Sequence, residues 1–295
     1  MHPTRTLAAA FALLTLSASA QTTAPVARVF HPAPPLPSYD VATIKPAVNV
    51  TNSSGMTLTR GAPIRQYIRD AYAPTLARLA LAQVIGGPDW IDKDQFSIDG
   101  KPPADLEVAM KKMKTEDQTV QQHMMQQSLL AERFHLKVHF EVREMPVYVL
   151  VPAKSGLKIK AVDAPAPRDP NSPPPPLPPP GPNTPVPPGM MVMMMSATGA
   201  RTVRAGATTM TNLVRMVSGQ GDIGDRPVID QTGFTGNFNI DNLTWASLGS
   251  ANSSDSPDLP SLGTALEETL GIKLVATKGP VEVVVIDSID HPTEN

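Results

Sequence analysis

The residues that could carry out chemistry in this chain fall into a few short groups, and one of them pairs a serine with a lysine. Ser155 and Lys158 have the S-x-x-K spacing in which a lysine activates a serine nucleophile. That chemistry needs a serine that opens a buried helix, with S-D-N and K-T-G partners. Ser155 is instead expected to follow a strand, and Thr277-Lys278-Gly279 has its residues in the wrong order. We therefore favour a turn and assign no catalytic residue.

Two histidines have a spacing that is known from zinc sites. His135 and His139 lie four positions apart, which suits a metal when both are on a helix. The residues from Phe134 to Val142 alternate as in a strand, so both imidazoles are expected on one solvated face. Two histidines without a third ligand make a poor zinc site, and a polar strand face is the favoured interpretation.

A methionine cluster occupies one short segment, which consists of Met190, Met191, Met193, Met194 and Met195. Thioethers are soft ligands that suit Cu(I). Neighbouring residues of a strand point to opposite faces, however, so at most two or three sulfurs can converge. Methionine also fills irregular apolar gaps, which is the alternative. The sequence assigns no metal-ligating residue and no cofactor.

Four aspartates are crowded into the segment 89–99, namely Asp89, Asp92, Asp94 and Asp99. They raise the questions of a calcium site and of an acid pair, but the glycine spacing of a calcium loop is missing. The same segment carries the apolar residues Trp90, Ile91, Phe96 and Ile98. We expect these to anchor the segment in a core and to leave the aspartates in solvent.

The overall composition excludes several classes of protein. The 295 residues include 25 Lys+Arg and 27 Asp+Glu, a net charge of −2 that provides no electrostatic footprint for nucleic acid. The absence of cysteine excludes disulfide scaffolds, thiolate metal sites and cysteine nucleophiles. We expect no nucleic-acid partner.

The first 20 residues have the pattern of a secretory signal peptide. Arg5 precedes an apolar run from Leu7 to Leu16, and Ala18-Ser19-Ala20 supplies the small residues of a cleavage site. The run is about half as long as a membrane span. We predict an exported protein of the periplasm or the extracellular space, with no transmembrane segment after cleavage.

Proline divides the remaining chain. Of the 24 residues from 165 to 188, 14 are proline, a density that prevents both helix and sheet pairing. We predict a loose N-terminal segment at 21–38, a first α+β unit at 39–163, a disordered proline-rich linker or loop at 164–189, and a second α+β unit at 190–295.

The two units have similar sequence patterns. The segments 57–62 and 202–207 each precede a stripe of apolar residues at helical spacing. These are Ile64, Tyr67, Ile68 and Tyr72 after the first segment. They are Met210, Leu213, Val214 and Val217 after the second. Each unit is predicted to be a β-α-β-α-β-β pseudo-repeat with a mixed or antiparallel sheet. Its last two strands are expected to form a hairpin, which turns at 144–146 or at 278–280. Chance similarity of common αβ patterns is the alternative.

Several stretches carry a family resemblance, among them YDVATIKP (39–46), VIGGPDWIDKDQFSIDGK (84–101), DRPVIDQTGFTGNFNI (225–240) and the segments 124–159 and 262–295. They resemble the soil-associated exported proteins of the domain-of-unknown-function 3738 family. The resemblance implies export and no established activity. The segment 264–274 and the strands after it are also similar to the short N-terminal modules of secretins and TonB-dependent receptors, which are interaction domains.

These observations favour a non-catalytic exported binding module of the cell envelope, whose partner is a protein or a peptide. Terminal hairpins would offer sheet edges to which a strand can be added. The first alternative is an exported hydrolase whose site is assembled from distant loops. The second is copper binding by the methionine cluster.

Overall fold

The structure is a computed structural model, and it describes residues 27–47, 57–74, 78–166, 185–196, 199–246 and 259–292. The predicted signal peptide and residues 167–184 of the proline-rich segment lie outside the described residues. No helix in the described parts of the chain is both long and apolar enough to cross a membrane.

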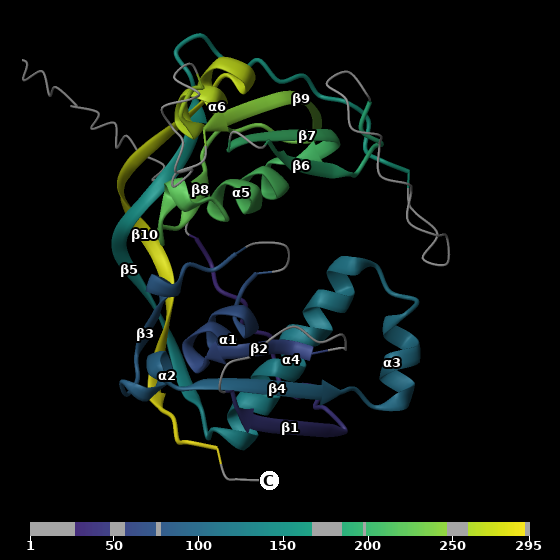
Figure 1. Cartoon of the computed structure of the whole chain (residues 1–295), viewed down its shortest axis with the longest axis vertical. Helices are drawn as coiled ribbons and strands as arrows, with labels where there is room; N and C mark the ends of the chain where they lie inside the picture. Colours follow the sequence, from purple (N-terminus) through teal and green to yellow (C-terminus); the bar gives the residue numbers. More distant parts are fainter. Residues whose placement is uncertain are drawn as a thin grey trace, which may run out of the picture.

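Two long antiparallel strands run through the molecule and join its two lobes (Figure 1). They are β5 (Lys137–Pro152) and β10 (Ile272–Ser288), and the pair that they form is called the ribbon below. Lys137 pairs with Ser288 in the lower lobe, and Pro152 pairs with Ile272 in the upper lobe. Each strand therefore contributes one half to each lobe.

The prediction of two closing hairpins is wrong, because β5 and β10 each continue straight through the expected turns. Pro146 lies opposite Lys278, and Pro280 lies opposite Glu144. Tyr148 and Glu282 lie two residues further along each strand, and their N–H groups point away from the partner strand. The N–H of Tyr148 donates to the carbonyl oxygen of Pro227, and the N–H of Glu282 donates to the carbonyl oxygen of Ala27. Backbone N–H groups two residues apart on a strand point to the same side, so an N–H at position 146 or 280 would also point outward. Because proline lacks only that outward N–H, the pairing of β5 with β10 loses no hydrogen bond.

The lower lobe contains an antiparallel sheet of order β1-β4-β2, whose strands are Val41–Pro46 (β1), Thr57–Pro63 (β2) and Gln95–Lys101 (β4). Its helices are Ile64–Ala71 (α1), Trp90–Lys93 (α2), Ala104–Met110 (α3) and Thr115–Arg133 (α4). The predicted stripe of α1 is confirmed, since Ile64, Tyr67 and Ile68 are all buried.

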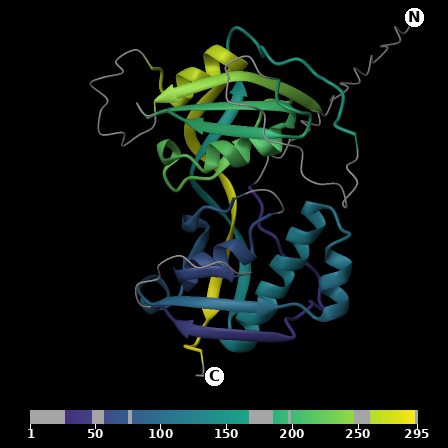
Figure 2. The same ribbon diagram turned by 45° about the vertical axis from the view of Figure 1, so that its right-hand side comes forward.

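The upper lobe contains an antiparallel sheet of order β6-β7-β9. Its strands are Met191–Met195 (β6), Ala200–Thr209 (β7) and Asn237–Ala246 (β9), and its helices are Met210–Ser218 (α5) and Leu262–Leu270 (α6). Figure 2 shows that the strands of the three-stranded sheet in each lobe run across the direction of β5 and β10. The predicted internal repeat stays a prediction.

Two short strands extend the ribbon into a mixed four-stranded sheet of order β3-β10-β5-β8. β3 (Val84–Gly86) pairs in parallel with β10, and β8 (Val228–Asp230) pairs in parallel with β5. A single-turn helix precedes each of them, η1 (Leu81–Gln83) before β3 and η2 (Gly221–Ile223) before β8. The α+β class and the mixed and antiparallel sheets are thus confirmed.

The hydrophobic cores explain why the ribbon holds the lobes together. Val284 and Ile286 of β10 are buried in the core of the lower lobe. Leu150 of β5 and Ile272 of β10 are buried in the core of the upper lobe. Neither core is complete without residues from both long strands.

Residues 27–31, which precede the first predicted unit, lie against the ribbon. Val29 is buried, and its N–H donates to Oε2 of Glu282 at 2.9 Å. The N–H of Glu282 in turn donates to the carbonyl oxygen of Ala27 at 2.9 Å. The side-chain amide of Gln127 donates to the carbonyl oxygen of Phe30 at 3.1 Å. These bonds attach the segment to both α4 and β10.

A pair of substitutions in β5 tests the role of the ribbon in the core. Leu150→Ala removes a side chain with 0% exposure and should lower the free energy of unfolding by about 2–5 kcal/mol. Val142→Ala removes a side chain that is 60% exposed on the same strand and should cost less than about 0.5 kcal/mol. Urea unfolding followed by circular dichroism measures both. Equal losses would contradict the assignment of Leu150 to a core.

Candidate functional site

Strand β6 forms one margin of the upper-lobe sheet, on the side of β7 away from β9 (Figure 1). Its five residues read Met-Val-Met-Met-Met and pair with β7 from Met191↔Ala205 to Met195↔Arg201. No other strand in the described parts of the chain pairs with it. β6 is therefore an edge strand without a charged residue.

Two hydrogen bonds establish which backbone groups of β6 face outward. The Gly206 N–H donates to the carbonyl oxygen of Met190 at 3.0 Å, and the Ser196 N–H donates to the carbonyl oxygen of Ala200 at 2.8 Å. The C=O group of residue 190 and the N–H group of residue 196 thus point toward β7. In an antiparallel pair, the residues whose backbone groups point toward the partner strand recur at every second position. The backbone groups of Val192 and Met194 must therefore point toward β7 as well. The N–H and C=O groups of residues 191, 193 and 195 point away from the sheet.

The side chains beside these outward groups are apolar and partly accessible. Met191 packs against the core of the upper lobe. Met193 is 45% exposed and Met195 is 71% exposed. Cross-strand partners share a face of the sheet, so Met193 lies beside the buried Val203 and Met195 lies beside Arg201. β6 thus presents an accessible methionine row next to backbone groups that no strand of the described residues pairs with.

Copper binding, the second alternative to a peptide-binding module, depends on the same methionines, and the register of β6 places them on two faces of the sheet. Met191, Met193 and Met195 share one face, whereas Met194 shares the other face with Thr202. The guanidinium of Arg201 lies on the face of Met195, where it donates to Oε1 of Gln220 at 2.5 Å. A cation beside the row disfavours binding of a second cation there. Copper binding stays a prediction.

The two histidines of the predicted strand face lie in different local structures. His135 has a φ of 49° in the turn before β5, so the predicted alternation begins too early. Its Nδ1 lies 3.2 Å from Oδ2 of Asp290. Nδ1 of His139 lies 2.7 Å from Oδ1 of Asp287, and its Nε2 lies 3.0 Å from Oε1 of Glu141. No group of three or more His, Cys, Asp or Glu residues is arranged for a metal in the described parts of the chain.

Ser155 and Lys158 lie in the loop after β5, as expected for a turn. Gly156 between them has a φ of 80°. The ammonium of Lys158 donates to the carbonyl oxygen of Glu268 at 2.7 Å. The lysine therefore ties this loop to the last turn of α6.

The four aspartates of the segment 89–99 do not form a common site. The carboxylate of Asp92 accepts two hydrogen bonds from Arg65, at 2.5 and 2.8 Å, and this interaction lowers the pKa of Asp92. Asp89 pairs with Lys93 at 2.9 Å, and Asp94 lies 3.1 Å from His291. The expected anchors Ile91, Phe96 and Ile98 are buried.

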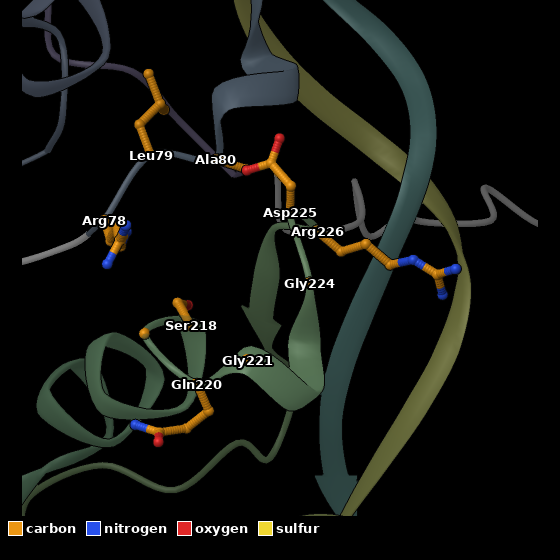
Figure 3. Close-up of a pocket in the computed structure, with 10 residues that line it drawn as sticks. Arg78, Leu79, Ala80, Ser218, Gln220, Gly221, Gly224, Asp225 and Arg226 are labelled. Carbon is orange, nitrogen blue, oxygen red and sulfur yellow. The ribbon is translucent and has the colours of Figure 1, made fainter. Parts of the chain in front are cut away.

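A pocket of about 190 Å³ lies between the lobes (Figure 3). The carboxylate of Asp225 reaches across it and accepts hydrogen bonds from the N–H groups of Leu81 at 2.7 Å and Ala82 at 2.6 Å. These are the first amides of η1, which have no acceptor inside a helix. The side chain of Arg226 points away from Asp225, toward the ribbon, where it covers the ring of Tyr148 at 5.3 Å. The pocket thus contains a contact that links η1 to the upper lobe.

The pocket also contains a glycine pattern that sequence reasoning missed. Gly219, Gly221 and Gly224 have the G-x-G-x-x-G spacing of a dinucleotide-binding loop and all line the pocket. In such a loop the glycines follow a strand and open a helix. Here they follow the end of α5 and lead to β8, so the negative end of a helix dipole faces the pocket. The arrangement disfavours a pyrophosphate.

The family model described as a protein of unknown function (DUF3738) matches residues 65–289, which is more than half of the chain. The chain belongs to this family. No curated protein and no solved structure matches it. The match includes β6, the ribbon and Asp225, whereas β1 and β2 precede it.

The ion pairs of His139 predict a pH effect. Hydrogen bonds with Glu141 and then with Asp287 raise the pKa of His139, and the bond with His139 lowers the pKa of Glu141. The stabilisation should therefore be present below the unfolded pKa of histidine, about 6.5, and should be lost as the pH rises through the higher folded value. At the acidic end it should be lost as the pH falls through the lowered pKa of Glu141. An NMR titration should give a His139 midpoint above 6.5 that falls in Glu141→Gln; an unchanged midpoint would contradict the pairing.

The contact between Asp225 and η1 gives a local prediction. Asp225→Ala leaves the amides of Leu81 and Ala82 without their acceptor, and it should speed their hydrogen exchange by about tenfold. Ser218→Ala changes a residue that lines the same pocket and should leave this exchange unchanged. Exchange measured by NMR tests both, and equal rates in the wild type and Asp225→Ala would contradict the role of Asp225.

Proposed function

We propose that this chain is a non-catalytic exported module that binds an extended apolar peptide segment of an envelope protein along the open edge of β6. The observation that carries this proposal is the row of outward N–H and C=O groups at Met191, Met193 and Met195. An extended peptide can pair with such a row and become a further strand of the sheet.

The chemistry of the edge indicates what kind of peptide it would accept. An added strand obtains its affinity from main-chain hydrogen bonds, so no conspicuous polar side chains are needed. Its side chains would alternate between the two faces of the sheet. Those on one face would contact Met193 and Met195, which favours uncharged apolar residues at every second position.

Other edges in the described parts of the chain are better protected against pairing. β1 carries Lys45 and ends at Pro46. β2, at the other margin of the lower sheet, carries Arg60 and ends at Pro63. Charged residues and proline both oppose strand addition. β3 and β8 have only three residues each. β9, at the other margin of the upper sheet, contacts α6. This contrast supports β6 as the edge that receives a partner.

Met193→Pro provides a direct test. The N–H of Met193 points away from β7, so proline should remove the outward donor without removing a β6–β7 hydrogen bond. Met193→Leu keeps the donor and the apolar side chain and serves as the matched control. Heptapeptides selected from a random phage-displayed library on the mature protein should be apolar at alternate positions. They should bind Met193→Pro at least about tenfold more weakly, and Met193→Leu about as well as the wild type.

Two outcomes would contradict the proposal. One is a library selection that yields no binder, and the other is a set of binders with equal affinity for the wild type and Met193→Pro. Circular dichroism of both variants must match the wild type, so that lost binding is not a consequence of unfolding. If Met193→Pro fails to fold, a peptide that is N-methylated at alternate positions tests the reciprocal hydrogen bonds, which run from the peptide N–H groups to the outward carbonyl oxygens of β6.

A further inference from the structure

Two methionines on the β6 edge differ from the other described methionines in their accessibility. Met193 is 45% exposed and Met195 is 71% exposed. All other methionines among the described residues are buried or only partly exposed. Met125, Met210 and Met216 are buried in the cores of the two lobes. An oxidant in solution therefore reaches the β6 edge long before it reaches the cores.

The chain has no cysteine, so no thiol competes with these thioethers for an oxidant. A peroxide or a hypochlorite transfers one oxygen atom to a thioether. The sulfur lone pair forms the new S–O bond while the O–O or O–Cl bond breaks. The products are a sulfoxide together with water, from hydrogen peroxide, or chloride, from hypochlorite. The sulfur is oxidised by two electrons, and the oxidant is reduced by two.

We propose that Met193 and Met195 form an oxidation site that controls the β6 edge, and that their conversion to sulfoxides prevents peptide binding. This inference rests on the proposed function. A sulfoxide replaces an apolar surface by a strongly polar acceptor. An added strand would have to desolvate that acceptor without supplying a hydrogen-bond donor in its place, which weakens binding.

The position of the two residues makes the change local and reversible. Both lie on the outer strand, and their side chains are exposed to solvent instead of packed in the core. Oxidation should therefore leave the upper-lobe core intact. Methionine sulfoxide reductases act on accessible sulfoxides and would restore the edge.

The test uses the mature protein and limiting hydrogen peroxide. Trypsin is expected to release the five methionines of the cluster in one peptide that ends at Arg201, and fragment ions separate their positions. Met193 and Met195 should be oxidised at least about fivefold faster than Met125, Met210 and Met216. Oxidation at both positions should weaken binding of the selected heptapeptide by about tenfold, and reductase treatment should restore it.

A double variant, Met193→Leu with Met195→Leu, is the matched control, because it keeps the apolar edge but cannot form the sulfoxides. Its peptide affinity after the same peroxide treatment should equal its own affinity before the treatment. Faster oxidation of the buried methionines, wild-type binding that survives complete oxidation at both positions, or an equal loss of binding in the double variant would each overturn the inference. Absence of binding before peroxide is added would instead contradict the proposed function.

Discussion

The register between β5 and β10 is the constraint on which the rest of the structure depends. Leu150 and Ile272 enter the upper core, and Val284 and Ile286 enter the lower core, from one continuous ribbon. A slip of a single residue would turn these side chains to the opposite face. It would also displace β3 and β8, which pair with the ribbon at fixed positions. The arrangement of the lobes, and thus the position of the β6 edge, follows from this pairing.

The fold class and the helices could be predicted because their signals are local. The stripe of α1 and most of the stripe of α5 consist of residues that are buried in the structure, as their spacing indicates. The long strands could not be predicted in the same way. Pro146 and Pro280 are typical of turns, yet both occupy strand positions whose amide would point outward. Only the identity of the partner strand reveals that these prolines are tolerated, and that partner lies far away in the sequence.

The candidate site was visible in the sequence as a methionine cluster, but its geometry was not. The spacing of Met191, Met193 and Met195 indicates one strand face, and nothing local shows that β6 lies at a sheet margin. Asp225 was missed for a similar reason, since its partners Leu81 and Ala82 belong to the other lobe. The glycines at 219, 221 and 224 show that a local sequence pattern can also suggest a site that the fold does not support. Their spacing matches a nucleotide motif, and only the preceding helix shows that the context is reversed.

The central claim is that an extended peptide becomes the next strand beside β6. The most direct measurement is an NMR structure of the complex with a selected heptapeptide, built on NOEs between the two backbones. The account predicts a ladder of backbone NOEs from the peptide to Met191, Met193 and Met195, with none to the ribbon strands. Contacts concentrated in the pocket between the lobes, with no backbone NOE to β6, would contradict it.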